Sequence, residues 1–105
     1  MTEYIQVSTT LATREDAGRL AGELVERRLA ACAQILGPIT STFWWKEKVN
    51  EEEEWLLTIK SRKDLYERIE AVIKKLHPYE VPEIIATPIT AGSREYLGWM
   101  DEDLV

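Results

Sequence analysis

The chain has 105 residues, which fits one domain with a modest core. Acidic residues outnumber basic ones by 19 to 13, and the net charge of −6 repels nucleic-acid phosphates and anionic lipid headgroups. No apolar run approaches the ~20 residues that a membrane-spanning helix needs. We therefore expect a single globular domain over residues 1–105, with neither a nucleic acid nor a membrane as its partner.

Cys32 is the only cysteine of the chain, so no intrachain disulfide can form. A lone thiol suits a reducing compartment, because disulfides persist mainly in oxidising ones. The first ten residues lack the basic region and apolar run of a secretory signal. These features predict a cytoplasmic protein.

The first third of the chain predicts a strand, a helix and a second strand. Residues 4–10 alternate and are rich in β-branched side chains, which is typical of a strand. Thr13 to Asp16 resembles a capping box, and the apolar spacing behind it predicts a helix to about residues 29–30. Residues 31–46 read as a long strand, interrupted near Gly37-Pro38 because proline lacks a hydrogen-bond donor.

The next segment predicts a hairpin and a second helix. We expect a turn around residues 49–51, with the four glutamates of 51–54 in solvent and a third strand over 54–61. Ser61 to Asp64 resembles another capping box, and it opens a helix with an apolar stripe. The helix should stop at His77, because a residue before proline avoids the α-helical region.

Residues 83–90 predict a fourth strand, and a short amphipathic helix follows Gly92-Ser93. The order β-α-β-β-α-β plus a tail is the ferredoxin-like pattern, an α+β sandwich. Right-handed crossovers then give the strand order 4-1-3-2. Pro38 and Pro88 fall on the two predicted edge strands, where proline is tolerated.

The second face of this sheet is expected to be apolar and therefore covered. Two helices cover one face only, yet Leu56, Trp44 and Ile84 point away from the strongest apolar stripes of their strands. A large exposed apolar area usually marks an interface, so we predict a closed homo-oligomer. The alternative is that the aromatic side chains pack locally within a curled hairpin.

Five collinear motifs carry a family resemblance over nearly the whole chain. They are "LVERRLAACAQI" from Leu24, "STFWW" from Ser41, "EEEWLLTIKS" from Glu52, "HPYEVPEI" from His77 and "YLGWM" from Tyr96. The chain resembles the CutA family of divalent-cation-tolerance proteins. The resemblance implies a ferredoxin-like subunit in a tight homotrimer, related in architecture to the nitrogen-regulatory signalling trimers, whose effectors bind between subunits.

The resemblance also directs attention to metal ligands, copper above all. Some family members carry a cysteine late in the first strand and a doubled histidine before Pro-Tyr. Here those positions hold Thr9 and Leu76-His77, so most soft ligands are missing. The candidate metal ligands are His77, Glu80, Glu83 and Cys32. The alternative for His77 is a structural role, in which its ring caps helix carbonyls or bonds across a subunit boundary.

A second group of side chains is expected at subunit interfaces or clefts. It comprises Trp44, Trp45, Trp55, Lys60, Tyr79 and Trp99. Lys60 has two interpretations: it receives an anionic ligand at the interface, or it is a strand residue whose ammonium group reaches solvent.

Two functional hypotheses follow, and neither is enzymatic, because nothing positions a histidine beside a nucleophile. The first is a homotrimer involved in the response to metal ions that binds Cu²⁺ or another divalent cation at inter-subunit clefts, with no cofactor required. The second is a trimeric scaffold or sensor for a small effector or partner protein, with no direct metal role.

Overall fold

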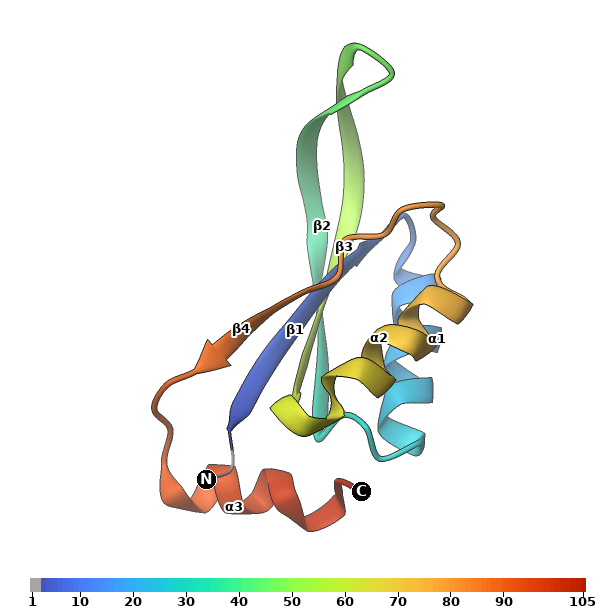
Figure 1. Cartoon of the computed structure of the whole chain (residues 1–105). Coiled ribbons are helices and arrows are strands. Elements are labelled where there is room, and N and C mark those ends of the chain that lie inside the picture. The colour runs from blue at the N-terminus through green and yellow to red at the C-terminus, as the bar shows by residue number, and fades with distance from the viewer. Residues whose placement is uncertain (1–2) are drawn as a thin grey trace.

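The computed structural model describes residues 3–105, which form a four-stranded sheet with three helices (Figure 1). The elements in chain order are β1 Tyr4–Leu11, α1 Arg14–Glu26, β2 Cys32–Trp45, β3 Lys48–Arg62, the 3₁₀ turn η1 Lys63–Leu65, α2 Tyr66–Leu76, β4 Ile85–Ile89 and α3 Arg94–Asp103.

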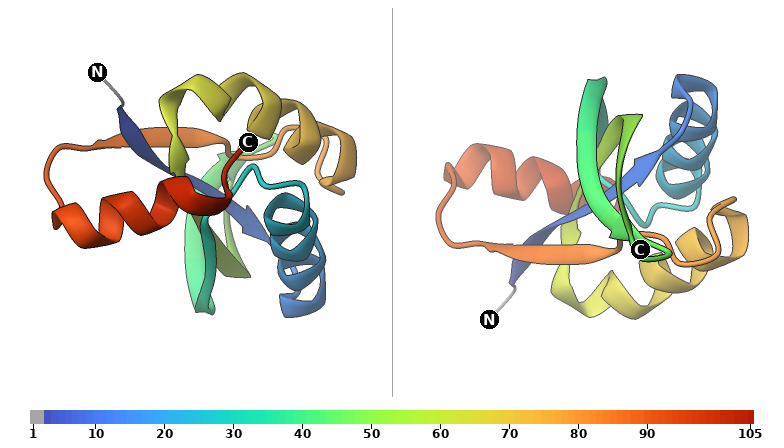
Figure 2. Two further views of the ribbon diagram at one scale, coloured as in Figure 1. Left: turned by 90° about the horizontal axis from the view of Figure 1, so that it is seen from below. Right: turned by 90° about the horizontal axis from the view of Figure 1, so that it is seen from above.

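The strands lie in the order β2-β3-β1-β4, and every neighbouring pair is antiparallel. This confirms the predicted ferredoxin-like topology, including the edge positions of Pro38 in β2 and Pro88 in β4. The two views of Figure 2 place α1 and α2 on the same side of the sheet. The other face of the sheet is left open by these two helices.

The core lies between the sheet and the two helices. Val7 and Leu57 from the strands, and Leu24 and Ile69 from the helices, have no exposed surface. Burial of each such side chain contributes roughly 1.5–3 kcal/mol. The amphipathic spacing predicted from the sequence therefore identifies the faces that build the domain.

Helix α1 ends earlier than predicted. It stops at Glu26 rather than at residues 29–30, because Arg28 adopts a left-handed backbone with φ of 60°. The Arg28 N–H donates to the Val25 carbonyl, and the Leu29 N–H to the Leu24 carbonyl, as in a helix-ending motif. Leu29 then turns into the core, which satisfies the apolar spacing without a helix.

The β2-β3 hairpin projects from the body of the domain (Figure 1). The radius of gyration is 14.4 Å, above the roughly 13 Å of a compact domain of this length, and the longest dimension is 45 Å. The predicted turn at residues 49–51 is wrong. The turn is formed by Lys46 and Glu47, both with positive φ, and the glutamates of 51–54 lie within β3.

The interruption predicted in the second strand is confirmed at Gly37-Pro38. The register between β2 and β3 shifts between Leu36 and Ile39. A side chain at residue 37 would bring its Cβ to 2.8 Å from the Trp55 ring, so only glycine fits beside it.

The predicted capping box at Ser61 is wrong. The Ser61 hydroxyl is buried and donates a 2.6 Å hydrogen bond to the Leu29 carbonyl, while η1 leads into α2 without a side-chain cap. The predicted end of this helix is confirmed, since α2 stops at Leu76 and His77 is extended.

The cap predicted at Thr13 is present, and α3 also has a side-chain cap. The Thr13 hydroxyl accepts from the Asp16 N–H at the start of α1, and the Ser93 hydroxyl accepts from the Tyr96 N–H at the start of α3. Both hydroxyls satisfy backbone donors that have no partner within the helix.

The open face of the sheet is mixed rather than apolar, which corrects the sequence expectation. The strand register places Gln6, Lys60 and Thr87 in one row of this face, and Gln34, Thr58, Ser8 and Ile85 in the next. The apolar side chains of this face lie away from its centre, at Leu36, Leu56 and Ile85. Ile84 and Ala86 instead belong to the helix-covered side.

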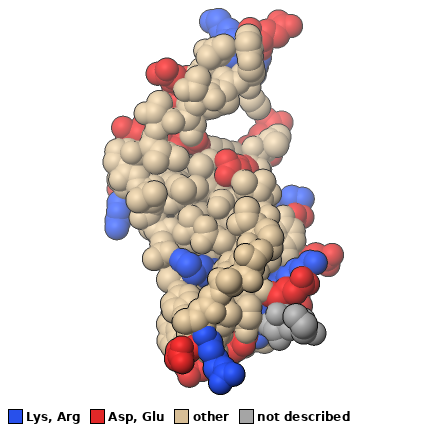
Figure 3. Space-filling view, turned by 90° about the vertical axis from the view of Figure 1, so that its left-hand side faces the viewer, with Lys and Arg blue, Asp and Glu red and all other residues tan. Residues whose placement is uncertain are grey.

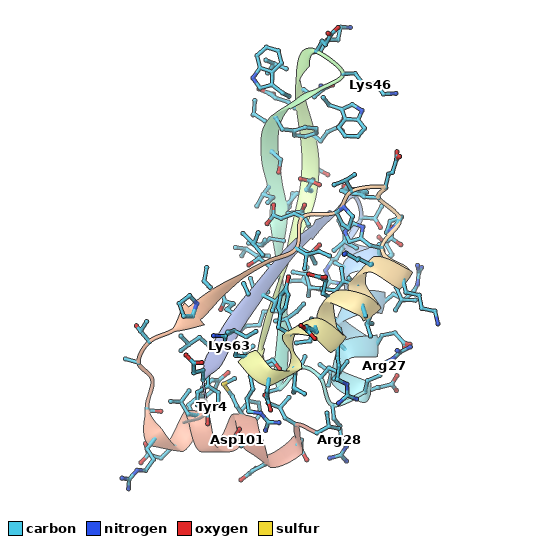
Figure 4. All side chains as sticks on the ribbon, viewed as in Figure 1. Tyr4, Arg27, Arg28, Lys46, Lys63 and Asp101 are labelled. Carbon is cyan, nitrogen blue, oxygen red and sulfur yellow. The ribbon has the colours of Figure 1, made fainter. Side chains whose placement is uncertain are left out.

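Helix α3 lies at the end of the molecule opposite the hairpin tip and is fixed by a polar network (Figures 1 and 4). The Tyr4 hydroxyl donates to Asp101 Oδ2 at 2.6 Å, and Arg62 pairs with Asp101 Oδ1 at 3.3 Å. Within residues 3–105, no helix has both the length and the apolar character that crossing a membrane requires.

Candidate functional site: the cleft at the base of the hairpin

The segment from His77 to Ile84, here called the connector, joins α2 to β4 and passes beside the base of the hairpin (Figure 1). Its start is fixed by the His77 N–H, which donates to the Ile73 carbonyl at 2.8 Å. Pro78 and Pro82 each restrict one backbone angle. The connector is therefore a rigid wall facing β3 and the end of β1.

Both ring nitrogens of His77 are engaged. Nε2 lies 2.8 Å from the Thr10 carbonyl oxygen and donates to it, while Nδ1 accepts from the Tyr79 N–H at 3.1 Å. This pair of bonds requires the neutral ring with its proton on Nε2. Burial lowers the His77 pKa, which favours that neutral form, although the Thr10 carbonyl and the charges of Asp16 and Glu54 oppose the shift.

Tyr79 ties the connector to the hairpin. Its hydroxyl donates a 2.7 Å hydrogen bond to Glu54 Oε2, and its ring packs at 4.7 Å, centre to centre, against His77. Glu54 is only 7% exposed. Burial and the Glu54 carboxylate raise the Tyr79 pKa strongly, so the phenol remains protonated and continues to donate.

Two hollows are lined by residues at or next to this contact. The aromatic hollow, of about 390 Å³, is lined by Phe43, Trp45, Asn50, Glu52, Glu54, Tyr79, Glu80 and Val81. The oxygen hollow, of about 420 Å³, is lined by Thr10, Ser41, Thr42, Phe43, Glu54, Val81 and Glu83. They share Phe43, Glu54 and Val81, so Glu54 contributes to both.

The cleft has a negative electrostatic character. Figure 3 shows acidic side chains around the base of the hairpin, beside a broad surface with few charges. Burial and the charge of Glu54 raise the Glu83 pKa. Among the described residues, no lysine or arginine forms an ion pair with Glu52, Glu54, Glu80 or Glu83. A bound cation would therefore meet carboxylates without a competing partner.

The four candidate metal ligands do not converge in one copy of the chain. Glu80 lines the aromatic hollow and Glu83 the oxygen hollow, while Cys32 pairs with Lys60 in the sheet. Lys60 lies six residues along β3 from Glu54, about 20 Å at the rise of a strand. Residues 3–105 contain no cluster of three or more histidine, cysteine, aspartate or glutamate side chains suited to a metal ion.

The candidate interface residues are distributed over several regions and do not form one group. Trp44 is 73% exposed on the hairpin, Trp45 and Tyr79 line the aromatic hollow, and Trp99 is half exposed on α3. Trp55 instead packs beside the core and against Gly37. Lys60 lies on the open sheet face, where its ammonium group donates to the Gln34 side-chain oxygen.

Sequence reasoning missed the central residue of the cleft, Glu54. It belongs to a run of four glutamates that indicates a solvated turn, and only the register of β3 shows that it faces Tyr79. Glu52 was missed for the same reason. The strand alternation gives the only signal in the sequence, because it places Glu52 and Glu54 on one side of the strand and Glu53 on the other.

Comparison with known proteins places the chain in a family. Residues 5–103 match the family model described as CutA1 divalent ion tolerance protein. The chain is 43% identical over 97 residues to the divalent-cation tolerance protein CutA of Thermus thermophilus, covering 92% of this chain and 94% of that one. It is 42% identical to the chloroplastic protein CutA 1 of rice, over 91% of this chain and 54% of the rice protein.

Solved structures of CutA proteins have the same fold as this chain. The CutA1 crystal structure from rice superposes with a TM-score of 0.95 at 39% identity, over 98% of this chain and 94% of that one. The Thermus thermophilus structure superposes with a TM-score of 0.92 at 42% identity, and the match covers 100% of both chains. The Archaeoglobus fulgidus structure superposes with a TM-score of 0.90 at 37% identity over 98% of each chain. It is described as a periplasmic divalent cation tolerance protein. The chain therefore belongs to the CutA1 divalent ion tolerance family.

Proposed function

We propose that this protein acts in divalent-cation tolerance, and in the response to metal ions such as copper, as a homotrimer that binds a divalent cation where its subunits meet. The observation that carries this proposal is the oxygen hollow. Two carboxylates, those of Glu54 and Glu83, line it, and neither has a cationic partner among the described residues. These two carboxylates alone form only part of a metal site.

Assembly is supported by the apolar surface that one copy leaves exposed. Trp44 is 73% exposed, Leu36 63%, Val81 75% and Ile85 55%, and Figure 3 shows a broad area almost free of charge. Large apolar side chains that one copy leaves exposed are typical of an interface between proteins. The free edges of β2 and β4 offer backbone groups that strands of a neighbouring copy can pair with.

The ligands of the oxygen hollow suit a hard cation. Its lining includes the carboxylate residues Glu54 and Glu83 and the hydroxyl residues Thr10, Ser41 and Thr42. The raised Glu83 pKa reflects burial and a neighbouring negative charge, both of which a divalent cation would offset. Ligands from an adjacent copy would complete the coordination.

His77 is an unsuitable ligand in this arrangement, because both of its ring nitrogens already form hydrogen bonds. We propose that it positions Tyr79 and the connector instead. Among divalent ions, Cu²⁺ binds most tightly to a given set of nitrogen and oxygen ligands, so a copper-linked response does not require a cysteine or histidine ligand. The site would bind the other divalent first-row metal ions more weakly than Cu²⁺.

Calorimetric titration of the metal-stripped protein with Cu²⁺ and Mn²⁺ tests this proposal. We expect saturable binding with at most one ion per subunit, weakened about tenfold or more in Glu83→Gln. Glu53→Gln is the matched control, since it removes the same charge from an exposed position on the opposite side of β3. Equal binding by both variants would contradict the oxygen hollow as the site.

The second candidate is a trimeric sensor or scaffold for a small effector or partner protein. It is favoured by the absence of a three-ligand cluster within residues 3–105 and by the ligand-sized aromatic hollow. Under either candidate we propose a binding protein rather than an enzyme, located in the reducing cytoplasm that suits the single, partly buried Cys32.

A further inference from the structure

The aromatic hollow combines features that a metal ion cannot use. Phe43, Trp45 and Tyr79 supply three aromatic side chains to its lining, and Val81 adds apolar surface. A hydrated metal ion gains nothing from apolar walls. An organic cation gains from both the aromatic rings and the burial of its own carbon atoms.

The negative charges of the hollow lie beside those rings. Glu54 is 7% exposed and holds its position through the 2.7 Å hydrogen bond from Tyr79, while Glu52 and Glu80 line the same space. Within residues 3–105, no lysine or arginine forms an ion pair with any of these three carboxylates. A buried carboxylate without a cationic partner is costly, and a cation that enters beside it offsets that cost.

The size and rigidity of the hollow suit a small molecule. Its volume of about 390 Å³ lies within the roughly 300–1,000 Å³ range of ligand pockets. Two chemically different walls face each other: the connector, fixed by the two His77 hydrogen bonds, and the hairpin strands β2 and β3. Preorganised walls reduce the ordering that binding requires.

We propose that the aromatic hollow binds a small organic cation of the guanidinium or alkylammonium type. The charged group lies between Glu52 and Glu54, and the apolar part packs against Phe43, Trp45 and Tyr79. This site shares Glu54 with the oxygen hollow, but it uses Glu52 in place of Glu83 and does not require a metal ion. The two proposals can fail independently, because one depends on Glu83 and the other on Glu52.

The test uses butylguanidinium and its neutral isostere N-butylurea, titrated into the assembled full-length protein. Binding is followed by calorimetry and by backbone amide shifts in NMR. We expect saturable binding of butylguanidinium, at least about tenfold weaker binding of butylurea, and weakening by salt. The shifted amides should lie in the connector and in residues 43–54.

Three variants locate the charge. Glu54→Gln keeps an oxygen that accepts from Tyr79, and Glu52→Gln changes an exposed side chain, so both should fold; each should weaken butylguanidinium binding about tenfold. Glu53→Gln is the matched control and should leave binding within about twofold. Equal affinity for butylurea, equal effects of Glu52→Gln and Glu53→Gln, or a hollow closed by a side chain of an adjacent copy would each overturn the proposal.

Discussion

The Tyr79 hydroxyl donates a 2.7 Å hydrogen bond to the buried carboxylate of Glu54, and this contact joins two segments that are 25 residues apart in the sequence. It fixes the connector against the hairpin, and its carboxylate lines both hollows of the cleft. Because Glu54 has no ion-pair partner within residues 3–105, the phenol is the group that compensates its burial.

Removal of this phenol hydroxyl should destabilise the fold. Tyr79→Phe leaves a buried carboxylate without its donor, and we expect a loss of about 2 kcal/mol in the free energy of unfolding, measured by urea denaturation. Tyr66→Phe is a matched control, because its hydroxyl donates at 2.8 Å to the more accessible Glu70 and should cost less. Equal losses in the two variants would show that the burial of Glu54 is unimportant.

The two hydrogen bonds of His77 predict a pH dependence of stability. Its pKa is lowered in the folded state, so the unfolded chain binds a proton first as the pH falls. Stability contributed by neutral His77 is complete above the unfolded pKa of about 6.5 and is lost as the pH falls toward the folded pKa. The raised Glu83 pKa acts in the opposite direction, since its contribution is lost as the pH rises.

His77→Gln separates these effects, because it removes the imidazole titration and leaves Glu83 unchanged. Denaturation between pH 7.5 and about 5.5 should show a decrease in stability that is larger for the natural chain than for the variant. His77 is the only histidine, so its imidazole proton resonances report its pKa directly. A measured pKa at or above about 6.5 would contradict the buried neutral ring.

Removal of two buried hydroxyls should change the free energy of unfolding in opposite directions. Within residues 3–105, Thr9 Oγ1 is buried without a hydrogen-bond partner, whereas the Ser61 hydroxyl donates to the Leu29 carbonyl. Thr9→Val should therefore raise the free energy of unfolding by about 1 kcal/mol, and Ser61→Ala should lower it by about 1–2 kcal/mol. Thermal or urea denaturation measures both, and a destabilised Thr9→Val would indicate that the Thr9 hydroxyl has a partner.

Trp44 should matter for assembly rather than for the subunit fold. Its side chain is 73% exposed in one copy, so Trp44→Ala removes little intramolecular packing. If an adjacent copy covers it, the variant loses about 2 kcal/mol of association free energy and dissociates at higher concentration. Thr40→Ala, at an exposed polar position of the same strand, is the control. Unchanged dissociation in Trp44→Ala, followed by sedimentation, would remove this residue from the interface.

The fold was predictable because its signals are local and repeated. The apolar spacing of Leu24 and Ile69, and the prolines on both edge strands, each point to the same topology. The hairpin turn was not predictable, because Lys46 and Glu47 adopt positive φ although neither is glycine or asparagine. Pairing along the whole length of β3 overrides the poor turn residues.

The candidate site was predictable only in part. The sequence places Tyr79 at an interface or cleft. It also allows a structural role for His77, which the two hydrogen bonds of its ring favour. It could not place Glu54, because the position of a residue in a glutamate run depends on strand register. The proposed set of His77, Glu80, Glu83 and Cys32 combined residues from separate regions, which linear spacing does not exclude.

The central claim is that one copy of the chain leaves apolar surface and a partial binding site that identical copies complete. Sedimentation equilibrium of the natural protein at low micromolar concentration tests it most directly. The account predicts a particle of three times the 12.1 kDa subunit mass. A stable species of 12.1 kDa with native secondary structure would contradict it.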